Sequence, residues 1–123
     1  MAKQKTIMVV DDSSTSTFLM ETFFEENGYN VIIAEDGHKA LKKLEVSTPD
    51  AIFLDLMMPK MSGFDVLSGI KKMESAKEIP VIIISAKTEK EDIDQAKKLG
   101  AIEYMYKPID IERALQLLHK LKI

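Results

Sequence analysis

Ala51-Ile52-Phe53-Leu54-Asp55-Leu56-Met57-Met58-Pro59 is the stretch of sequence that decides the fold of this chain. Four apolar residues run directly into a single carboxylate, and a loop containing Pro59 follows. A short, continuous apolar run of this kind is typical of a strand buried on both faces of a parallel sheet. Asp55 would then lie at the rim of the sheet, where open α/β folds bind their ligands. Because an unpaired buried charge is costly, Asp55 needs partners from elsewhere in the chain.

Further apolar runs with the character of strands occur on both sides of this stretch, and helical patterns lie between them. The expected strands cover residues 6–10, 30–34, 51–55, 80–84 and 104–106. Each is followed by an amphipathic pattern that opens with a capping residue, and these are found in the segment 13–15 and at Asp36, Ser62, Thr88 and Asp110. Strict alternation predicts a five-stranded parallel sheet with right-handed crossovers and helices on both faces, an α/β fold.

Composition narrows the class of protein. The chain has 123 residues, of which 46% are hydrophobic and 30% charged, which is typical of one globular domain. A net charge of -3 gives no footprint for nucleic acid or an anionic membrane, and cysteine is absent. No signal peptide and no apolar run of membrane-spanning length occur. We therefore expect a cytoplasmic single domain over residues 1–123, with no output domain, no nucleic-acid partner and no membrane partner.

Polar side chains stand at the carboxyl ends of four of the expected strands. They are Asp11 and Asp12, Asp55, Ser85 and Lys107. Parallel strands bring these ends to one edge, so three carboxylates would repel one another unless a cation neutralises them. Oxygen ligands with room for water suit Mg²⁺, and a metal beside an ammonium and a hydroxyl suits a phosphoryl group. Asp55 is the best candidate for the nucleophile because it stands alone on the central strand.

Several sequence elements occur together in a characteristic order: Val10-Asp11-Asp12, Leu54 to Pro59, Gly63, Ser85-Ala86 and Lys107-Pro108. In this order and spacing they resemble the receiver domain of bacterial two-component response regulators, of the chemotaxis-receiver type, over essentially the whole chain. The resemblance implies a flavodoxin-like doubly wound (βα)5 fold with strand order 2-1-3-4-5. It also implies that Asp55 accepts a phosphoryl group from a sensor histidine kinase or a histidine phosphotransfer protein.

The same resemblance assigns roles around Asp55. It implies a Mg²⁺ (or Mn²⁺) ion held by Asp12, Asp55 and the backbone carbonyl of Met57, with Asp11 acting largely through a bound water. Ser85 and Lys107 would contact the phosphate, together with the backbone of Met57 and Ala86. Ser85 and Tyr104 would form the switch pair, and Met57 and Lys87 would tune the phosphoryl lifetime. The Lys107-Pro108 bond is commonly cis in the family, and the output surface is usually formed by the fourth helix, fifth strand and fifth helix.

Other interpretations explain fewer of these sequence elements. Asp11 and Asp12 also suit a helix N-terminus, and Tyr104 also suits core packing. An aspartyl-phosphate phosphatase would want a second aspartate where Met57 stands, and a cap domain. It stays open whether the chain is a receiver domain excised from a larger response regulator or hybrid kinase. The identity of the kinase, the identity of the downstream target and the choice between monomer and phosphorylation-dependent dimer also stay open. We expect no enzyme activity beyond self-catalysed phosphotransfer and autodephosphorylation.

Overall fold

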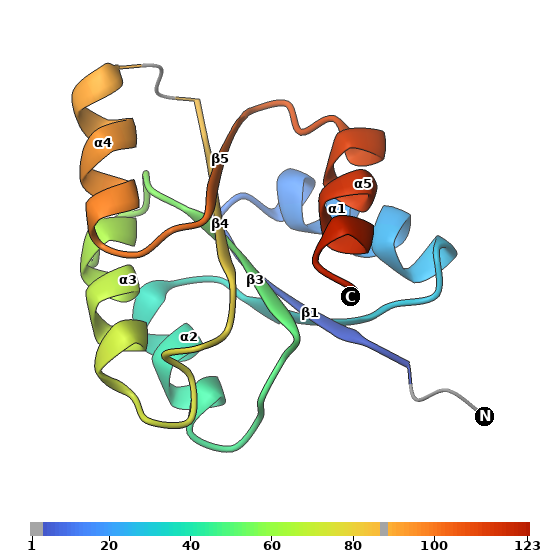
Figure 1. The fold of residues 1–123 in the computed structure, drawn as a ribbon, viewed down its shortest axis with the longest axis horizontal. Coiled ribbons are helices and arrows are strands. Elements are labelled where there is room, and N and C mark those ends of the chain that lie inside the picture. The colour runs from blue at the N-terminus through green and yellow to red at the C-terminus, as the bar shows by residue number, and fades with distance from the viewer. Residues whose placement is uncertain (1–3, 87–88) are drawn as a thin grey trace.

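A computed structural model describes residues 4–86 and 89–123, and in these residues strands and helices alternate along the chain (Figure 1). The strands are β1 (Thr6–Val10), β2 (Asn30–Ala34), β3 (Ala51–Asp55), β4 (Val81–Ser85) and β5 (Glu103–Tyr106). The helices are α1 (Ser14–Glu26), α2 (Gly37–Leu44), α3 (Gly63–Lys72), α4 (Lys90–Lys98) and α5 (Ile111–Lys120). The predicted alternation is confirmed.

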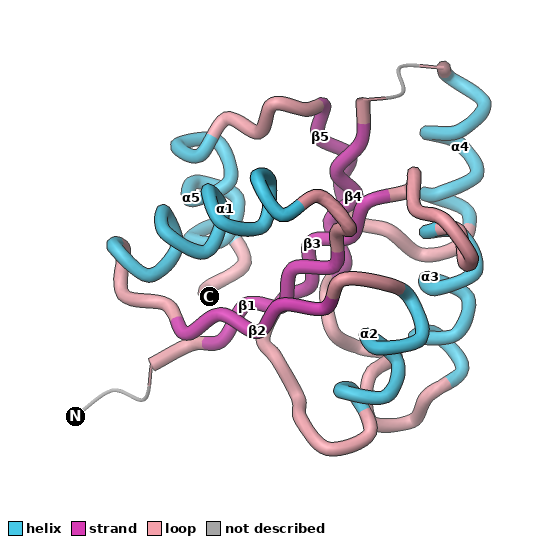
Figure 2. The backbone as a smooth tube through the Cα atoms, turned by 180° about the vertical axis from the view of Figure 1, so that it is seen from behind, coloured by secondary structure: helices cyan, strands magenta, loops and turns pink. Residues whose placement is uncertain are grey.

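The strands form one parallel sheet in the order β2-β1-β3-β4-β5, which Figure 2 shows between two groups of helices. The central strand β3 pairs with β1 on one side and with β4 on the other. In register, Asp55 lies opposite Ile84, and Ser85 lies opposite Tyr106. The carboxyl ends of the strands therefore meet at one edge, and the predicted flavodoxin-like strand order is confirmed.

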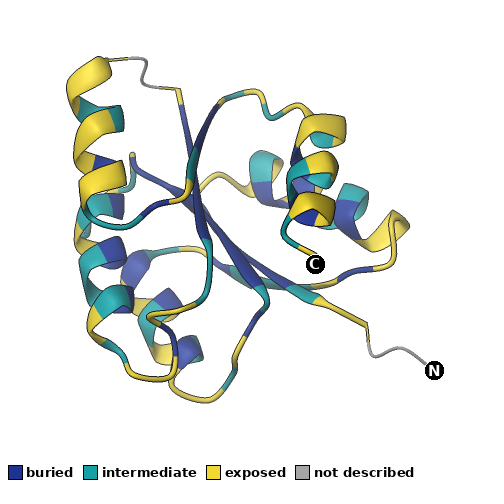
Figure 3. Ribbon diagram, in the orientation of Figure 1, coloured by how far each residue is buried: buried dark blue, intermediate teal, exposed yellow. Residues whose placement is uncertain are grey.

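Each face of the sheet carries its own core. Helices α1 and α5 cover one face, and α2, α3 and α4 cover the other (Figures 1 and 2). Alternate residues of one strand supply opposite faces: Phe53 packs with α1 and α5, whereas Ile52 and Leu54 pack with α2, α3 and α4. All five residues of β3 are buried, and the exposed residues lie on the outer faces of the helices and in the loops (Figure 3). Burial on both faces explains why β3 reads as an unbroken apolar run.

The helices begin where short polar side chains satisfy the free amides of the first turn. Ser13, Asp36, Ser62 and Asp110 each accept a hydrogen bond from the backbone amide three residues ahead. Helix α4 differs, because its N-cap is Glu89 and, within the described chain, no side-chain hydrogen bond caps it. Thr88, which the sequence predicted as the cap of this helix, lies outside the described residues.

Strands β4 and β5 differ from the expected ranges, and β4 ends at Ser85 and not at Ile84. Strand β4 begins at Val81 and not at Pro80, because proline has no backbone amide to donate to the ladder. The carbonyl of Pro80 still accepts a hydrogen bond from the amide of Ile52 at 3.0 Å. Strand β5 begins one residue early, at Glu103. Within residues 4–86 and 89–123, none of the helices combines the length and apolar character that crossing a lipid bilayer requires.

Candidate functional site

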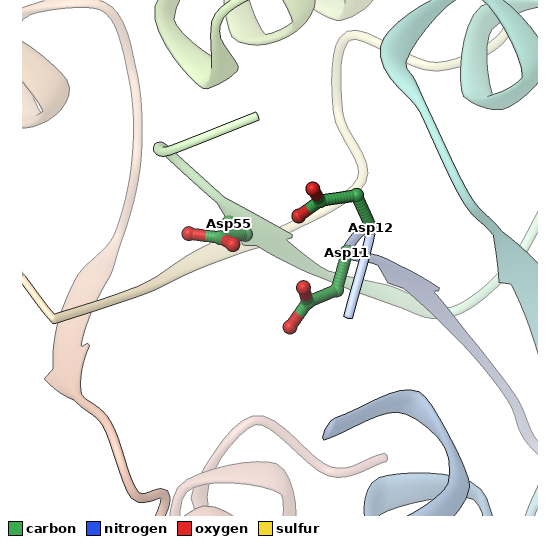
Figure 4. A group of neighbouring side chains, drawn as sticks. All are labelled: Asp11, Asp12 and Asp55. Carbon is green, nitrogen blue, oxygen red and sulfur yellow. The ribbon is translucent and has the colours of Figure 1, made fainter. Parts of the chain in front are cut away.

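Three carboxylates gather at the carboxyl ends of β1 and β3 (Figure 4). Asp11 and Asp12 follow β1, and Asp55 is the last residue of β3. One oxygen atom from each lies within 4.8 Å of the other two. Asp11 and Asp55 are buried, whereas Asp12 is exposed. The structure thus brings together the three acidic residues that the sequence predicted, and it leaves the cluster open to solvent on the side of Asp12.

Lys107 reaches this cluster from the end of β5. Its Nζ lies 2.8 Å from Oδ2 of Asp11 and 3.1 Å from Oδ2 of Asp55. In the strand order these residues stand at β5, β1 and β3, so the lysine side chain passes the end of β4. The backbone amide of Lys107 donates to the carbonyl of Ser85 at 2.9 Å, which ties the start of the lysine to β4. The ammonium group is therefore the cation that neutralises part of the acidic cluster.

Backbone amides orient both buried carboxylates. Oδ1 of Asp11 accepts from the amide of Ser13 at 2.9 Å, and Oδ1 of Asp55 accepts from the amide of Met57 at 3.0 Å. In each carboxylate the other oxygen, Oδ2, faces Lys107. One oxygen fixes the plane of the group and the second is turned to the site. The Asp55 carboxylate is thus held between the Met57 amide and the Lys107 ammonium.

The electrostatics of the site favour an additional cation. Burial raises the pKa of Asp55, and the nearby charge of Asp11 adds to this, against the opposing effect of the Met57 amide and of Lys107. Burial lowers the pKa of Lys107, but its contacts with Asp11 and Asp55 outweigh the burial, so the net shift is upward. Lys107 is therefore charged at neutral pH. Among the described residues, one ammonium contacts the three-carboxylate cluster, so that cluster is short of positive charge.

The donor set fits a hard divalent cation. Oδ2 of Asp11 is buried, and its partner among the described residues is the ammonium of Lys107 at 2.8 Å. The cluster of Asp11, Asp12 and Asp55 offers oxygen atoms alone, and the exposed Asp12 leaves room for water. Mg²⁺ prefers such oxygen ligands and keeps several of its waters. The residues present are those that this ion requires.

The other residues singled out from the sequence lie around the same edge, with one exception. Ser85 is fully buried at the end of β4, and Ala86 follows it as an exposed residue. Met57 is half exposed directly after β3. Lys87, predicted to tune the phosphoryl lifetime, lies outside the described residues. Their assigned roles stay predictions.

Tyr104, the predicted partner of Ser85, is buried in the core of the sheet face that α2, α3 and α4 cover. Its side chain is 7% exposed and belongs to the core beneath α2, α3 and α4. The rings of Tyr104 and Tyr106 meet edge to face with centroids 5.7 Å apart. The packing role that the sequence also suggested for Tyr104 is therefore confirmed, and its part in a switch stays a prediction. The Lys107-Pro108 bond is cis, as the resemblance implied.

Sequence reasoning missed an apolar groove beside the site. This groove, of about 380 Å³, lies between α1 and the segment 107–109. Leu19, Met20, Phe23, Lys107 and Pro108 are among its lining residues. A signal was present in the sequence, because α1 carries apolar residues at positions 18, 19, 20, 23 and 24, more than one buried stripe can hold. The surplus is visible as Phe18 and Leu19, which are 59% and 50% exposed.

Comparison with known proteins agrees with this geometry. The family described as the response regulator receiver domain matches residues 7–119, nearly the whole chain. The chain belongs to the response regulator receiver domain family. Such domains receive phosphoryl groups from histidine kinases and bind Mg²⁺ in an acidic site, so the expected family and its general signalling role are confirmed. The aspartyl-phosphate phosphatase alternative has no support in the comparisons.

Relatives of this receiver domain include both short and long proteins. PilH of Pseudomonas aeruginosa is 32% identical over 113 residues, covering 92% of this chain and 93% of PilH. PilG of the same species is 37% identical, covering 89% of this chain and 81% of PilG. The regulator PhoP of Bacillus subtilis is 40% identical over 85% of this chain, but the match spans 42% of PhoP. The receiver domain thus corresponds to most of the first two proteins and less than half of the third.

Solved structures show the same fold. The chemotaxis protein CheY4 of Vibrio cholerae superimposes with a TM-score of 0.91 at 28% identity, covering 96% of this chain and 98% of CheY4. The receiver domain of a Pseudomonas aeruginosa sensor histidine kinase, described with a magnesium ion coordinated in its active-site cleft, gives a TM-score of 0.88 at 24% identity. It covers 96% of this chain, and 97% of its own length is matched. At this identity the second likeness supports the fold.

Proposed function

We propose that this receiver domain is a phospho-acceptor switch in which Asp55 takes a phosphoryl group from a phosphohistidine donor. The donor is a sensor histidine kinase or a histidine phosphotransfer protein. The observation that carries the proposal is the placement of the buried Asp55 carboxylate against Lys107, beside Asp11 and Asp12, at the carboxyl edge of the sheet. An acidic oxygen that is oriented, accompanied by an ammonium and open to solvent on one side is suited to accept a phosphoryl group.

The transfer exchanges one bond for another. An electron pair on an Asp55 carboxylate oxygen forms the new O–P bond while the P–N bond of the phosphohistidine breaks. The pair from the broken bond leaves with the donor ring, which is protonated on its other nitrogen and departs as neutral imidazole. Lys107 stays charged throughout, because its pKa is raised by its carboxylate contacts, and its ammonium attracts the phosphoryl oxygens.

Asp11, Asp12 and Asp55, with the backbone carbonyl of Met57, would hold Mg²⁺, and Mn²⁺ is a hard cation of the same preference. When bound, the cation offsets negative charge on the phosphoryl oxygens. The Ser85 hydroxyl and the backbone amides of Met57 and Ala86 are the proposed hydrogen-bond donors to the group. These assignments rest on the position of each residue at the carboxyl edge of the sheet.

The proposed output is a change in partner binding. Modification turns the Asp55 carboxylate into an acyl phosphate, so the contacts available to Lys107 and Ser85 change, and a two-state surface responds. We place that surface on α4, β5 and α5, with Tyr104 as the partner of Ser85. The domain itself carries out phosphotransfer and autodephosphorylation only.

The proposed location is the cytoplasm. The absence of cysteine fits a reducing cytoplasm.

The direct test uses a small phosphodonor. The protein is incubated with acetyl phosphate and Mg²⁺, and the modified residue is located by intact mass and peptide mapping. We expect one acid-stable, hydroxylamine-sensitive phosphoryl group on the peptide that contains Asp55, and no modification when EDTA replaces Mg²⁺. Absence of the group, or the same uptake in EDTA, would contradict the proposal.

The groove beside Lys107 is the proposed contact for the donor protein. A protein donor has to bring its histidine to Asp55, and Leu19 offers apolar surface on α1 next to that path. The test uses an autophosphorylated kinase that modifies the wild type. We expect Leu19→Asp to make phosphoryl transfer from this kinase about tenfold slower, which equals about 1.4 kcal/mol. Modification by acetyl phosphate should stay unchanged, because this donor needs no protein contact.

The matched control for this variant is Val46→Asp. Val46 is also an exposed apolar residue, but it follows α2 and is not part of the groove. Transfer is measured with radiolabelled kinase at several receiver concentrations. Equal transfer to the Leu19 and Val46 variants would remove the groove from the donor interface.

Met57 is expected to make the phosphoryl group long-lived compared with a chemotaxis-type receiver. It stands two residues after the acceptor and is half exposed, but a thioether is a poor group for orienting an attacking water. We expect Met57→Asn to release phosphate several-fold faster than wild type, because a carboxamide can hold that water. Loss of radiolabel after removal of the donor measures the rate, and Met57→Leu serves as the apolar control. Slower phosphate release from the asparagine variant would contradict the proposed role of Met57 in the phosphoryl lifetime.

A further inference from the structure

Gly63, the first residue of α3, packs its backbone directly on the backbone of the acceptor. Its amide donates to the carbonyl of Leu56 at 3.0 Å. A β-carbon at this position would lie 2.5 Å from the carbonyl oxygen of Asp55 and 2.5 Å from the Cα of Leu56. Both are backbone atoms, so no side chain can rotate away to make room. The start of α3 therefore touches the peptide that follows the proposed nucleophile, and only glycine permits this contact.

The loop between β3 and α3 is fixed at both ends. The hydrogen bond between Leu56 and Gly63 closes it, and within it Lys60 has a positive φ of 69°. The amide of Met61 donates to the carbonyl of Pro59 at 2.7 Å across this residue, which makes a tight three-residue turn. At the other end, Met57 donates its amide to Oδ1 of Asp55. A loop closed in this way transmits a displacement at Gly63 to the peptides next to Asp55.

We propose that Gly63 is a positioning residue for the acceptor site. Its bare backbone lets α3 approach until it sets the plane of the Asp55–Leu56 and Leu56–Met57 peptides. Those peptides lead into the Met57 carbonyl and amide that the proposed function assigns to the divalent cation and the phosphoryl group, so this inference rests on that function. A methyl group at position 63 would push α3 and the strand end apart, and small displacements of positioned groups are costly to binding and transfer.

Gly69 supplies a matched control within the same helix. A β-carbon there would meet the methyl groups of Leu41 at 3.1 Å, the flexible end of a side chain. Alanine in place of glycine inside a helix favours the helix. Gly69→Ala therefore adds the same methyl group to α3 without touching the acceptor backbone. In the double variant, the higher helix propensity at position 69 offsets part of the stability that the steric clash at position 63 removes.

The experiment compares wild type, Gly63→Ala, Gly69→Ala and the double variant as full chains. The Mg²⁺ dissociation constant is measured by titration calorimetry well below the melting temperature, and the rate of modification by acetyl phosphate is followed by mass. We expect the dissociation constant to rise by about tenfold or more in the two proteins that carry Gly63→Ala, and to stay unchanged in Gly69→Ala alone. The modification rate should fall in the same two proteins.

A purely structural glycine would give a different result. It would lower the melting temperature in EDTA and leave the Mg²⁺ dissociation constant of the folded protein as in wild type, which would overturn the proposal. Failure of both proteins with the Gly63→Ala substitution to fold would assign Gly63 to the fold alone, with the same consequence. A wild type that binds no Mg²⁺ and takes up no phosphoryl group would instead overturn the proposed function itself.

Discussion

Asp55→Asn is expected to abolish phosphoryl uptake and, in the absence of divalent metal, to make the folded domain more stable. The first effect follows because a neutral carboxamide has no anionic oxygen with which to attack phosphorus. The second follows from burial, which raises the pKa of Asp55 in the folded state, with Asp11 adding to the shift. At neutral pH the ionised Asp55 therefore costs stability, and asparagine removes that cost, which we expect to be about 1–2 kcal/mol.

The stability gain should depend on pH in a defined direction. Because the folded pKa lies above the unfolded one, folding is favoured while Asp55 is protonated, and this advantage is lost as pH rises through the folded pKa. The gain from Asp55→Asn should be largest at neutral pH and should shrink on acidification below the unfolded pKa. Urea unfolding in EDTA at neutral and acidic pH measures it.

Asp50→Asn is the control for this variant. Asp50 precedes β3 at the opposite edge of the sheet, where its carboxylate accepts from the amide of Thr6 at 2.8 Å. Its replacement should leave phosphoryl uptake intact. Uptake by Asp55→Asn, or a loss of stability in that variant at neutral pH, would contradict this account of the site.

Lys107→Met is expected to destabilise the metal-free domain and to increase its stabilisation by Mg²⁺. Removing the ammonium leaves Asp11 and Asp55 buried together without their cation, and methionine keeps the apolar stem. Loss of one member of a fully buried ion pair costs about 3–5 kcal/mol, and the quarter-exposed lysine reduces our expectation to about 1–2 kcal/mol. Mg²⁺ should then have more uncompensated charge to neutralise.

Melting temperatures in EDTA and in saturating Mg²⁺ test this expectation. Lys97→Met, at an exposed position on α4, is the control and should leave both values close to wild type. Phosphoryl uptake from acetyl phosphate should also fall in the Lys107 variant, because an ammonium that attracts the phosphoryl oxygens is lost. An unchanged melting temperature in EDTA, or a smaller response to Mg²⁺, would show that Lys107 does not balance the carboxylates.

The sheet was predictable because its sequence signals are strong and local. Ala51 to Leu54 could be read as a doubly buried strand since both faces of β3 are covered by helices. The convergence of Asp11, Asp55 and Lys107 followed from one rule, that parallel strands end at a common edge. For these residues, the positions in the sequence were enough to predict that the side chains lie close together.

Features that depend on packing between distant elements were not predictable in the same way. The sequence places Lys107 at the edge but does not say which carboxylates its side chain reaches past β4. It names Gly63 without showing that the glycine backbone rests on Asp55. The start of α4 also depends on how the whole helix docks, and α4 begins at Lys90, directly after its N-cap residue Glu89.

The path of Lys107 has a consequence for the edge of the sheet. Strand β5 has four residues and pairs with β4 alone, so in backbone terms it is the strand most open to fraying. Directly after it, the ammonium of Lys107 contacts Asp11, which follows β1, and Asp55, which ends β3. Any reaction that changes the charge on Asp55 changes the strength of its contact with Lys107. Amide hydrogen exchange along Glu103–Tyr106 should therefore report the state of the acceptor from a distance.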